Sequence, residues 1–443
     1  MQRPERHAMS KHPDSVSQAS GPSEGFILVL NCGSSSIKFA LYDAGVHPLP
    51  RQPMWSGRAV DIGGPNTTYA DSETPEGPLV TPEEGDRTPY VAALDYIRAQ
   101  VRKQLHGRTL LGVVHRVVHG GPKYSAPVRI DEQVLHDLES YIPLAPLHQP
   151  YALEAIAALL HDLPDLPQIA CFDTAFHHTM PKVEKQLSLP WELYERGVRR
   201  YGFHGTSHDY VSEKGAEIAG LDRSQSKIVT AHIGSGASMA AILNGKSIDT
   251  SMGLTPNEGL MMGTRAGDID SGVIDFLLAK KDYDPAFIAP YLKKAEEGKS
   301  HLDLEDVTFL LTKKSGLQGI STQGSDMRDV SKAAESGSHR DKLAIAMHSY
   351  RVKKYVGAYA AALGGLDLLV FTAGVGENRA ALRTDVCQGL EFLGIKIDET
   401  LNSQAVGGKS MIISAADSRV KVVVVATDEE YMIARDTYTI LSK

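Results

Sequence analysis

Hydrophobic residues surround a short polar corner near the start of the chain. An apolar run over residues 26–30 leads into Asn31, Gly33 and a group of serines, and apolar residues then dominate 37–41, with Lys38 among them. This pattern predicts a strand, a tight turn and a second strand. Glycine lets backbone N–H groups converge on one point, and hydroxyl and ammonium groups bind phosphate. The corner is either an ordinary hairpin or a phosphate-binding turn.

The same pattern recurs in the second half of the chain, over residues 227–243. Sliding this segment onto the first aligns Gly234 with Gly33 and His232 with Asn31. One hairpin repeated at the opening of each half, roughly 200 residues apart, indicates a duplicated domain. We expect two phosphate-binding hairpins that face one cleft, which favours the second interpretation of the corner.

Hydrophobic periodicity predicts the remaining elements. Helices are expected at 89–105, 151–162, 209–219 and 341–363, and strands at 110–118, 168–172, 366–371 and 420–426. Residues 273–350 are expected to be largely helical, interrupted by a polar loop at 315–331. Thr427, followed three residues later by Glu430, predicts a capping box at the start of a final helix. The two acidic residues between them then remain as candidate ligands.

Charged residues stand where two of the predicted strands end. Arg116 lies near the end of the strand at 110–118, and Asp173 directly follows the strand at 168–172. Proteins of the α/β class place ligand groups at such positions. Asp173 could instead cap the turn that follows it.

Glycine-rich segments carry further candidate groups. The loop at 199–208 combines arginines and histidines with two glycines, and Arg265 lies between Gly263 and Gly267. An arginine held by glycines can clamp an anion because its planar guanidinium is always charged. Later, a predicted strand leads into the Gly-x-Gly of 374–376 and a helix, whose N-terminus would favour phosphate. The Gly-x-x-x-x-Gly-Lys-Ser/Thr phosphate loop does not occur.

Composition narrows the class of protein. A length of 443 residues predicts two domains of roughly 200 residues. The net charge of −8 argues against nucleic acid or a membrane surface as a partner. The three cysteines are far apart, so neither a disulfide framework nor a zinc site is expected. No apolar run reaches the ~20 residues that span a bilayer. Residues 1–24 are polar, and we expect a disordered extension on a cytoplasmic protein.

Together these loops assemble the groups that phosphoryl transfer requires. Carboxylate and amide oxygens suit Mg²⁺, which takes one or two protein groups and keeps water and substrate phosphates. Arginine and histidine suit the charge on transferring phosphoryl oxygens. Transfer from a nucleotide, in a cleft between two domains, uses every one of these loops.

A series of motifs resembles the acetate kinase family, which includes propionate and butyrate kinases, within the actin-like ATPase superfamily. The motifs are NCGSSSIKF, HRVVHGG, APLHQP, FDTAFH, YGFHGTSH, AHIGSGAS, MGLTPNEGLMMGTRAGDID and GVGEN. The resemblance implies an α/β fold of two duplicated actin-like (ribonuclease H-like) domains around a nucleotide and substrate cleft. It leaves 1–24 without a counterpart. It implies a first domain of 25–175 plus 427–443, on the acyl and magnesium side, and a second of 176–426, which binds nucleotide.

The resemblance also implies a role for each matching residue. The metal ligands would be Asn31 and Glu429. The catalytic residues would be Asp173, His204, Arg265 and His148. The acyl substrate would lie against Arg116, Val118, Leu147, Phe203 and Pro256. The nucleotide contacts would be Ser34, Ser36, Lys38, His232, Ile233, Gly234, Ser235, Gly236, Asp326, Met327, Arg328, Gly374, Val375, Gly376, Glu377 and Asn378.

The implied reaction is reversible, Mg²⁺-dependent transfer of the γ-phosphoryl group of ATP to acetate, with Mn²⁺ as an alternative metal. Transfer would be direct and in line, giving acetyl phosphate and ADP. A carboxylate with a pKa near ~4.3 is already ionised at neutral pH and needs no general base. We therefore expect Asp173 to orient Mg²⁺ or a water. Ser235 departs from the family's usual Asn and tolerates left-handed backbone less well, so its phosphate contact could run through backbone or water.

Three alternatives stay open. The chain could be a propionate or butyrate kinase of the same family, with Val118 controlling acyl length. It could use pyrophosphate, against which the segments 326–328 and 374–378 argue. It could also be a non-catalytic, ATP-driven actin-like switch protein, against which the acyl-site residues argue. The resemblance implies a homodimer formed through the helix at 341–363, and no nucleic-acid or membrane partner.

Overall fold

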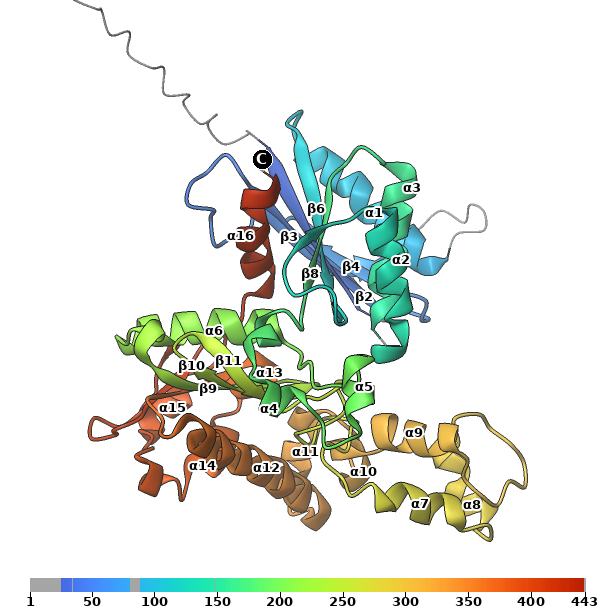
Figure 1. Cartoon of the computed structure of the whole chain (residues 1–443), viewed down its shortest axis with the longest axis vertical. Coiled ribbons are helices and arrows are strands. Elements are labelled where there is room, and N and C mark those ends of the chain that lie inside the picture. Colours follow the sequence, from blue (N-terminus) through green and yellow to red (C-terminus); the bar gives the residue numbers. More distant parts are fainter. Residues whose placement is uncertain (1–24, 34, 80–87, 147, 442–443) are drawn as a thin grey trace, which may run out of the picture.

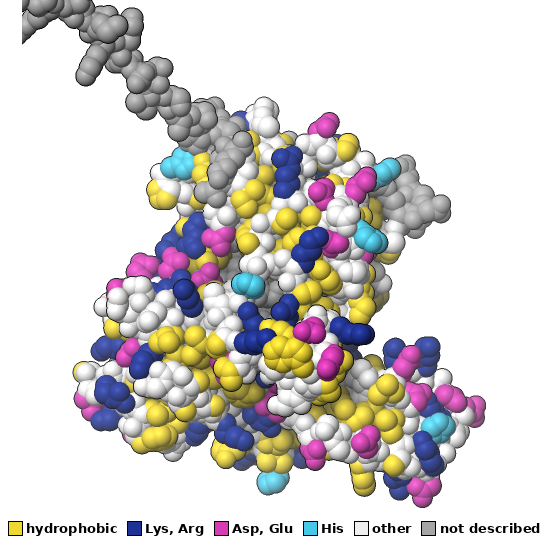
Figure 2. All heavy atoms as spheres, viewed as in Figure 1, with side chains coloured by type: hydrophobic (Ala, Val, Ile, Leu, Met, Phe, Trp, Pro, Cys, Tyr) yellow, Lys and Arg dark blue, Asp and Glu magenta, His cyan; other side chains and the backbone are white. Residues whose placement is uncertain are grey.

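The computed structural model describes residues 25–33, 35–79, 88–146 and 148–441. Ser34, Leu147 and the extension at 1–24, which the sequence singled out, lie outside the described residues. The described chain is an α/β structure built around two sheets, one above the other in Figure 1. Basic and acidic side chains are interspersed over both parts on the face that Figure 2 shows.

Within the described residues, the first sheet has the strand order β5-β4-β3-β2-β1-β6-β8-β7. Its strands are β1 (Phe26–Cys32), β2 (Ser36–Asp43), β3 (Trp55–Val60), β4 (Thr68–Asp71), β5 (Gly77–Pro78), β6 (Leu110–Val117), β7 (Val128–Arg129) and β8 (Gln168–Phe172). Successive residues of β1 enter two different hydrophobic clusters, as Leu28 and Val29 illustrate. Burial on both faces explains why this strand reads as a continuous apolar run.

The second sheet has the order β11-β10-β9-β12-β14-β13. Its strands are β9 (Lys227–Ile233), β10 (Ala237–Leu243), β11 (Lys246–Thr250), β12 (Leu368–Thr372), β13 (Met411–Ile412) and β14 (Lys421–Val424). The series β11-β10-β9-β12-β14 repeats the series β3-β2-β1-β6-β8 of the first sheet. In both, the first three strands are antiparallel neighbours and the last three are parallel. The predicted repeat of the two hairpins is therefore confirmed.

Helices cover the outer face of each sheet (Figure 1). The first sheet packs against α1 (Pro89–Gln104), α2 (Glu132–Ser140) and α3 (Gln149–Asp162) in one buried cluster. The second packs against α12 (His339–Leu363) and α14 (Ala380–Cys387) in another. The predicted helices at these places are confirmed; α3 begins two residues early because Pro150 is tolerated in a first helical turn.

Two helices lie between the sheets, and each packs on the sheet of the other repeat rather than on the sheet whose strand precedes it. The helix α6 (Gly205–Ala219) follows β8 of the first sheet but packs on β9, β12 and β14. The helix α16 (Glu429–Leu441) follows the last strand of the second sheet but packs on β1, β2 and β6. A single hydrophobic cluster contains residues of both sheets and both helices. The exchange brings Glu429 to the edge of the first sheet.

The remaining helices lie mostly at the periphery. They are α4 (Lys182–Lys185), α5 (Trp191–Glu195), α7 (Gly272–Ala279), α8 (Pro285–Ile288), α9 (Leu304–Lys313), α10 (Gly316–Ile320), α11 (Met327–Glu335), α13 (Ala373–Asn378) and α15 (Glu399–Gln404). In the described part of the chain, no helix combines the length and apolar character that crossing a membrane requires.

Three local predictions are wrong. The loop expected at 315–331 contains α10 and the start of α11, because Asp326 caps α11 by accepting the Arg328 N–H at 2.8 Å. The Gly-x-Gly of 374–376 lies inside α13 rather than before a helix. The capping box also fails. Asp428, not Thr427, accepts the N–H three residues on, at 3.1 Å, because the Thr427 hydroxyl lies against a serine of α6.

Candidate active site

The carboxyl ends of β1, β6 and β8 place three polar side chains together. These strands are parallel neighbours, and their register sets Asn31 beside Arg116 and Arg116 beside Cys171. Asp173 follows β8 directly, and its N–H donates to Val117 O at 3.1 Å. The three side chains therefore share one edge of the sheet, the edge at which parallel α/β sheets bind ligands.

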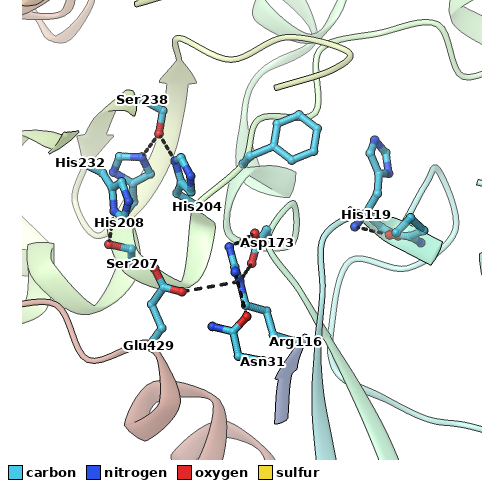
Figure 3. A network of polar contacts seen from close by, with 12 residues as sticks. Asn31, Arg116, His119, Asp173, His204, Ser207, His208, His232, Ser238 and Glu429 are labelled. Atoms are coloured by element: carbon cyan, nitrogen blue, oxygen red, sulfur yellow. Dashed lines mark hydrogen bonds and ion pairs between the residues drawn. The ribbon is translucent and has the colours of Figure 1, made fainter. Parts of the chain in front are cut away.

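Arg116 is the centre of this group (Figure 3). Its Nε and Nη2 donate to the two carboxylate oxygens of Asp173 at 2.8 and 2.6 Å. Its Nη1 donates to Asn31 Oδ1 at 3.0 Å. Glu429, at the start of α16, places Oε2 3.5 Å from Arg116 Nε. Because the Asp173 carboxylate accepts hydrogen bonds from two nitrogens of the guanidinium, the orientation of the guanidinium is fixed.

Two carboxylates share this one guanidinium. Burial raises the pKa of Asp173, and Arg116 counteracts that rise. Burial has the same effect on Glu429, but the positive charge of Arg116 prevails, so the pKa of Glu429 lies below its ordinary value. Burial disfavours the charge of Arg116, yet attraction to both carboxylates raises its pKa. The group around Arg116 therefore sets two carboxyl groups against one guanidinium.

The turn between β9 and β10 supports the opposite side of the site. A Cβ at Gly236 would lie 2.8 Å from Arg265 Nη2 and 3.7 Å from His204 Cε1, so both side chains lie against this turn. Arg265 also donates to Pro256 O. Burial lowers the pKa of Arg265, but an arginine stays charged at neutral pH. Among the described residues, no carboxylate forms an ion pair with Arg265.

His204 has a left-handed backbone conformation, with φ of 55°. This conformation is uncommon for residues other than glycine and persists where the surrounding structure imposes it. The neighbouring Gly205 supplies the constraint, because its N–H donates to Asp173 O at 2.8 Å. A Cβ on Gly205 would lie 2.3 Å from that oxygen. His204 is therefore tied to the backbone of the carboxylate that holds Arg116.

A network of histidines and hydroxyl groups lies behind His204 (Figure 3). Ser238 Oγ is 2.8 Å from both His204 Nδ1 and His208 Nε2. Thr230 Oγ1 is 2.7 Å from His208 Nδ1. The rings of His204 and His232 stack, with centroids 4.1 Å apart. Burial and the neighbouring histidines lower the pKa of His204 and of His208 well below the ordinary value, so both rings are neutral.

Of the predicted acyl contacts, Val118 and Phe203 are buried, and the Pro256 carbonyl accepts a hydrogen bond from Arg265. Val118 and Phe203 lie in one buried cluster although they come from different segments. His148 precedes α3, and its pKa is lowered to about 4 by burial and by the positive charges of Arg265 and Arg116. His148 is therefore neutral, and it lies close enough to both arginines for their charges to act on its ring.

Comparison with known proteins identifies the family. Residues 26–435 match the model of the acetokinase family. The chain belongs to this family. It is 45% identical over 421 residues to the acetate kinase of Porphyromonas gingivalis, covering 94% of this chain and 99% of that protein. It is also 45% identical over 434 residues to the acetate kinase of Bacteroides thetaiotaomicron, covering 94% and 100%.

Solved structures of the family share the fold. The crystal structure of Porphyromonas gingivalis acetate kinase matches 94% of this chain and 100% of that chain, with a TM-score of 0.79 and 43% identity. A propionate kinase from Francisella tularensis matches 93% and 98%, with a TM-score of 0.78 and 38% identity. The predicted duplicated actin-like α/β fold is confirmed.

The nucleotide segments expected for this family meet at the β9–β10 turn. A Cβ at Gly234 would lie 3.8 Å from the Cβ of Ala373, the first residue of α13. A Cβ at Gly263 would lie 3.6 Å from Ser235 Oγ and 3.5 Å from the Cβ of Ser325. Ser325 directly precedes the N-cap residue of α11. Three segments far apart in the chain therefore border one turn, and their contact with nucleotide stays a prediction.

Several predicted nucleotide contacts already bond within the protein. Glu377 Oε1 accepts two backbone N–H groups at 2.9 and 3.1 Å, one on α13 and one just before α16. Asn378 donates to one backbone carbonyl and accepts one backbone N–H, both at 2.9 Å. Met327 is buried in the core, and Asp326 pairs with Arg328. These side chains therefore support the backbone of the segments, and the pair of Asp326 and Arg328 does so at the surface.

The contacts expected from the first hairpin lie at its turn. Lys38 is exposed on β2, and its charge helps to lower the pKa of Glu429, so it stands beside the site. Ser36 closes the turn, with its backbone O accepting the Gly33 N–H at 2.8 Å.

In the second hairpin, Ile233, at the end of β9, is fully buried in the core.

Sequence reasoning missed the residues behind His204. Ser238 and Thr230 point into the network from β10 and β9, and His208 belongs to α6. One signal was present, because His204 and His208 are four residues apart at the start of a helix and so share a face. The hydroxyl partners had no comparable signal.

Proposed function

We propose that this protein is an acetate kinase, which transfers the γ-phosphoryl group of ATP to acetate and yields acetyl phosphate and ADP. One observation carries the proposal. The ion group around Arg116, from the first sheet, lies beside His204 and Arg265, which the second sheet supports. Membership of the acetokinase family and the similarity to named acetate kinases support the proposal.

Bringing one anion to another is the main difficulty of this reaction, and Arg265 addresses it. A buried cation without a carboxylate partner is costly, so a site that keeps one is built for an anionic ligand. Arg265 fits the carboxylate of acetate and the equatorial oxygens of the phosphoryl group. Arg116, which already faces two carboxylates, would complete the clamp from the other side.

The attacking oxygen needs no base, because acetate is ionised at neutral pH. Asp173 has both oxygens on Arg116 in this structure, so we propose that it fixes the guanidinium rather than binding Mg²⁺ or a water. His204, neutral and close to Arg265, would donate a hydrogen bond to the phosphoryl oxygens. His148 would support the same charge from the acyl side.

The residues present fit a magnesium ion that arrives with the nucleotide. No group of three or more His, Cys, Asp or Glu side chains in the described residues is arranged to hold a metal. Mg²⁺ bound to nucleotide takes only one or two protein oxygens, and the carboxylate and amide oxygens beside Arg116 are of the type that it prefers. Glu429 would hold it, with Asn31 alongside. The ion would supply neutralisation of phosphate charge; Mn²⁺ would serve similarly.

The decisive experiment is to trap acyl phosphate as hydroxamate from purified protein, ATP, Mg²⁺ and acids of two to four carbons. We expect hydroxamate from acetate, with smaller amounts from propionate and butyrate. Omission of ATP or Mg²⁺ provides the matched controls. No hydroxamate with any acid would overturn the proposal, and a preference for propionate would favour the activity named for the Francisella protein.

The assembly and location follow as further proposals. The divisions 25–175 plus 427–443 and 176–426 agree with the exchange of α6 and α16. On α12, Leu343, Met347 and Tyr350 are exposed at helical spacing, a face suited to a homodimer. Sedimentation analysis should show a dimer, and a monomer would contradict this proposal.

The location is a further proposal. Three buried free cysteines fit a reducing cytoplasm.

A further inference from the structure

We infer that Ser238 and His208 are positioning residues that set the tautomer of His204, keeping a proton on its Nε2. The inference rests on the proposed function, in which His204 donates a hydrogen bond to the transferring group. It concerns residues that do not touch substrate. Four groups, Thr230, His208, Ser238 and His204, share the protons of this network.

Ser238 cannot treat its two histidine partners alike. Its Oγ lies 2.8 Å from His204 Nδ1 and 2.8 Å from His208 Nε2, and a hydroxyl has one proton. It therefore donates to one ring and accepts from the other. Two directions are possible along the chain from Thr230 through His208 and Ser238 to His204, and each fixes every tautomer in it.

The first direction satisfies every group. The Thr230 hydroxyl donates to His208 Nδ1 at 2.7 Å, so the proton of that neutral ring lies on Nε2. His208 Nε2–H donates to Ser238 Oγ, and the Ser238 hydroxyl donates to His204 Nδ1. His204 then keeps its proton on Nε2, on the far side of the ring from Ser238.

The reverse direction leaves a hydroxyl proton without an acceptor. His208 Nδ1–H would donate to Thr230 Oγ1, and the Thr230 hydroxyl would need a further acceptor. Thr230 is fully buried, and in the described structure its hydroxyl has no other hydrogen-bond partner. A buried polar group without a partner is penalised, so the first direction prevails.

Neighbouring groups keep this arrangement in place. His177 Nε2 lies 2.9 Å from Phe203 O, and a carbonyl can only accept, so that nitrogen carries the proton. Its Nδ1 then accepts from Ser247 Oγ at 2.8 Å. The bond to Phe203 holds the backbone directly before His204. Ser247 thus serves a histidine whose tautomer is fixed independently, which makes it a matched control for Ser238.

The tautomer matters because the ligand is an anion. A proton on Nε2 offers a donor to phosphoryl oxygens, whereas the other tautomer would present a lone pair to negative charge. The whole benefit of a preorganised donor depends on this choice. Ser238 and His208, neither of which touches substrate, would determine which nitrogen of His204 carries the proton.

The first test is spectroscopic and needs no turnover. Protein labelled with ¹⁵N-histidine, without ligands, should show a pyridine-type Nδ1 and a pyrrole-type Nε2 for His204. The His204 signals are assigned by their loss in H204Q. A pyrrole-type Nδ1 in the intact protein would overturn the inference, whatever the activity.

The second test is kinetic. We expect Ser238→Ala to lower kcat about tenfold, less than the ~10²–10³ lost when a donor itself is removed, with KM values for acetate and ATP within about twofold. Ser238→Thr, which keeps the hydroxyl, should recover most of the loss, and Ser247→Ala should stay within about threefold of the parent protein. An unchanged kcat in Ser238→Ala, or an equal loss in Ser247→Ala, contradicts the inference.

The two proposals fail in different ways. Absence of hydroxamate from the parent protein would reject the acetate kinase activity and leave the ¹⁵N result standing. A normal hydroxamate yield with the opposite tautomer of His204 would reject only the positioning role. If Ser238→Ala does not fold, the ¹⁵N measurement on the parent protein still decides.

Discussion

The two sides of the site occupy equivalent edges of two sheets with the same strand order, yet their chemistry is opposite. In the first sheet, register sets Asn31 beside Arg116, and ionised side chains crowd that edge. In the second sheet, the same register sets His232 beside Thr372, and neutral rings and hydroxyl groups fill the edge. The cation on that side, Arg265, comes from a loop.

This contrast shows what a duplicated fold does and does not provide. The repeat supplies two edges that face each other, with a turn at the end of each first strand. The charges are then distributed unequally, so that paired charges stand on one side and an unpaired cation with neutral donors on the other. An anion is attracted to the second side and a metal ion to the first. Function therefore lies in the side chains and not in the fold.

Removing the unpaired cation should have the largest effect. We expect Arg265→Ala to lower kcat by ~10²–10³, because a preorganised charge in a buried site is lost. Steady-state assays with acetate and ATP would measure it. Arg419→Ala, which removes a peripheral arginine, is the control. A kcat for Arg265→Ala within a few-fold of the parent protein would mean that the two sides do not differ as described.

Disturbing the paired charges should come next. Asp173→Asn would replace one carboxylate oxygen by a donor that faces Arg116, and we expect kcat/KM to fall about 100-fold. If Asp173 holds Arg116, raising the Mg²⁺ concentration will not restore activity. Restoration at high Mg²⁺ would instead assign Asp173 to the metal, and undisturbed turnover at every Mg²⁺ concentration would deny it either role.

Weakening the metal side should change a binding constant more than a rate. Glu429→Gln removes the negative charge of a carboxyl group whose pKa lies below its ordinary value. We expect the Mg²⁺ concentration for half-maximal activity to rise about tenfold. Saturating Mg²⁺ should recover much of kcat. The exposed pair of Arg58 and Glu76 offers a control, since Glu76→Gln removes a surface carboxylate. Equal Mg²⁺ dependence in the two variants would exclude Glu429 from the metal site.

The smallest effect concerns stability on the neutral side. Burial lowers the pKa of His177 to about 4, below the ~6.5 of an unfolded histidine. Its contribution is complete above pH ~6.5 and is lost as pH falls toward 4, by about 2 kcal/mol between pH 7 and 5. Urea unfolding at several pH values would measure this. His177→Gln should reduce the fall in stability between pH 7 and 5 by about this amount, and the exposed His339→Gln should not. Equal profiles in the parent protein and His177→Gln would contradict the neutral state.

Much of the fold could be predicted because its signals are local. The strand β1 is apolar throughout, since both of its faces are buried, and the repeat of its hairpin was visible in the order of glycines and serines. The positions of Arg116 and Asp173 at strand ends followed from the same pattern. The helix start at Asp428 was missed because the hydroxyl of Thr427 bonds across to α6, a partner 220 residues away in the chain.

The sequence by itself determined the strands, the duplicated hairpins and the residue types that a phosphoryl-transfer site needs. Only the tertiary structure decided how those residues combine: that Asp173 grips Arg116 at two points, that α16 crosses to the first sheet with Glu429, and that Ser238 joins two histidines. The reason is physical. Periodicity records which face of an element is buried, whereas hydrogen bonds and charge pairs between distant segments depend on distances that exist only after the chain has folded.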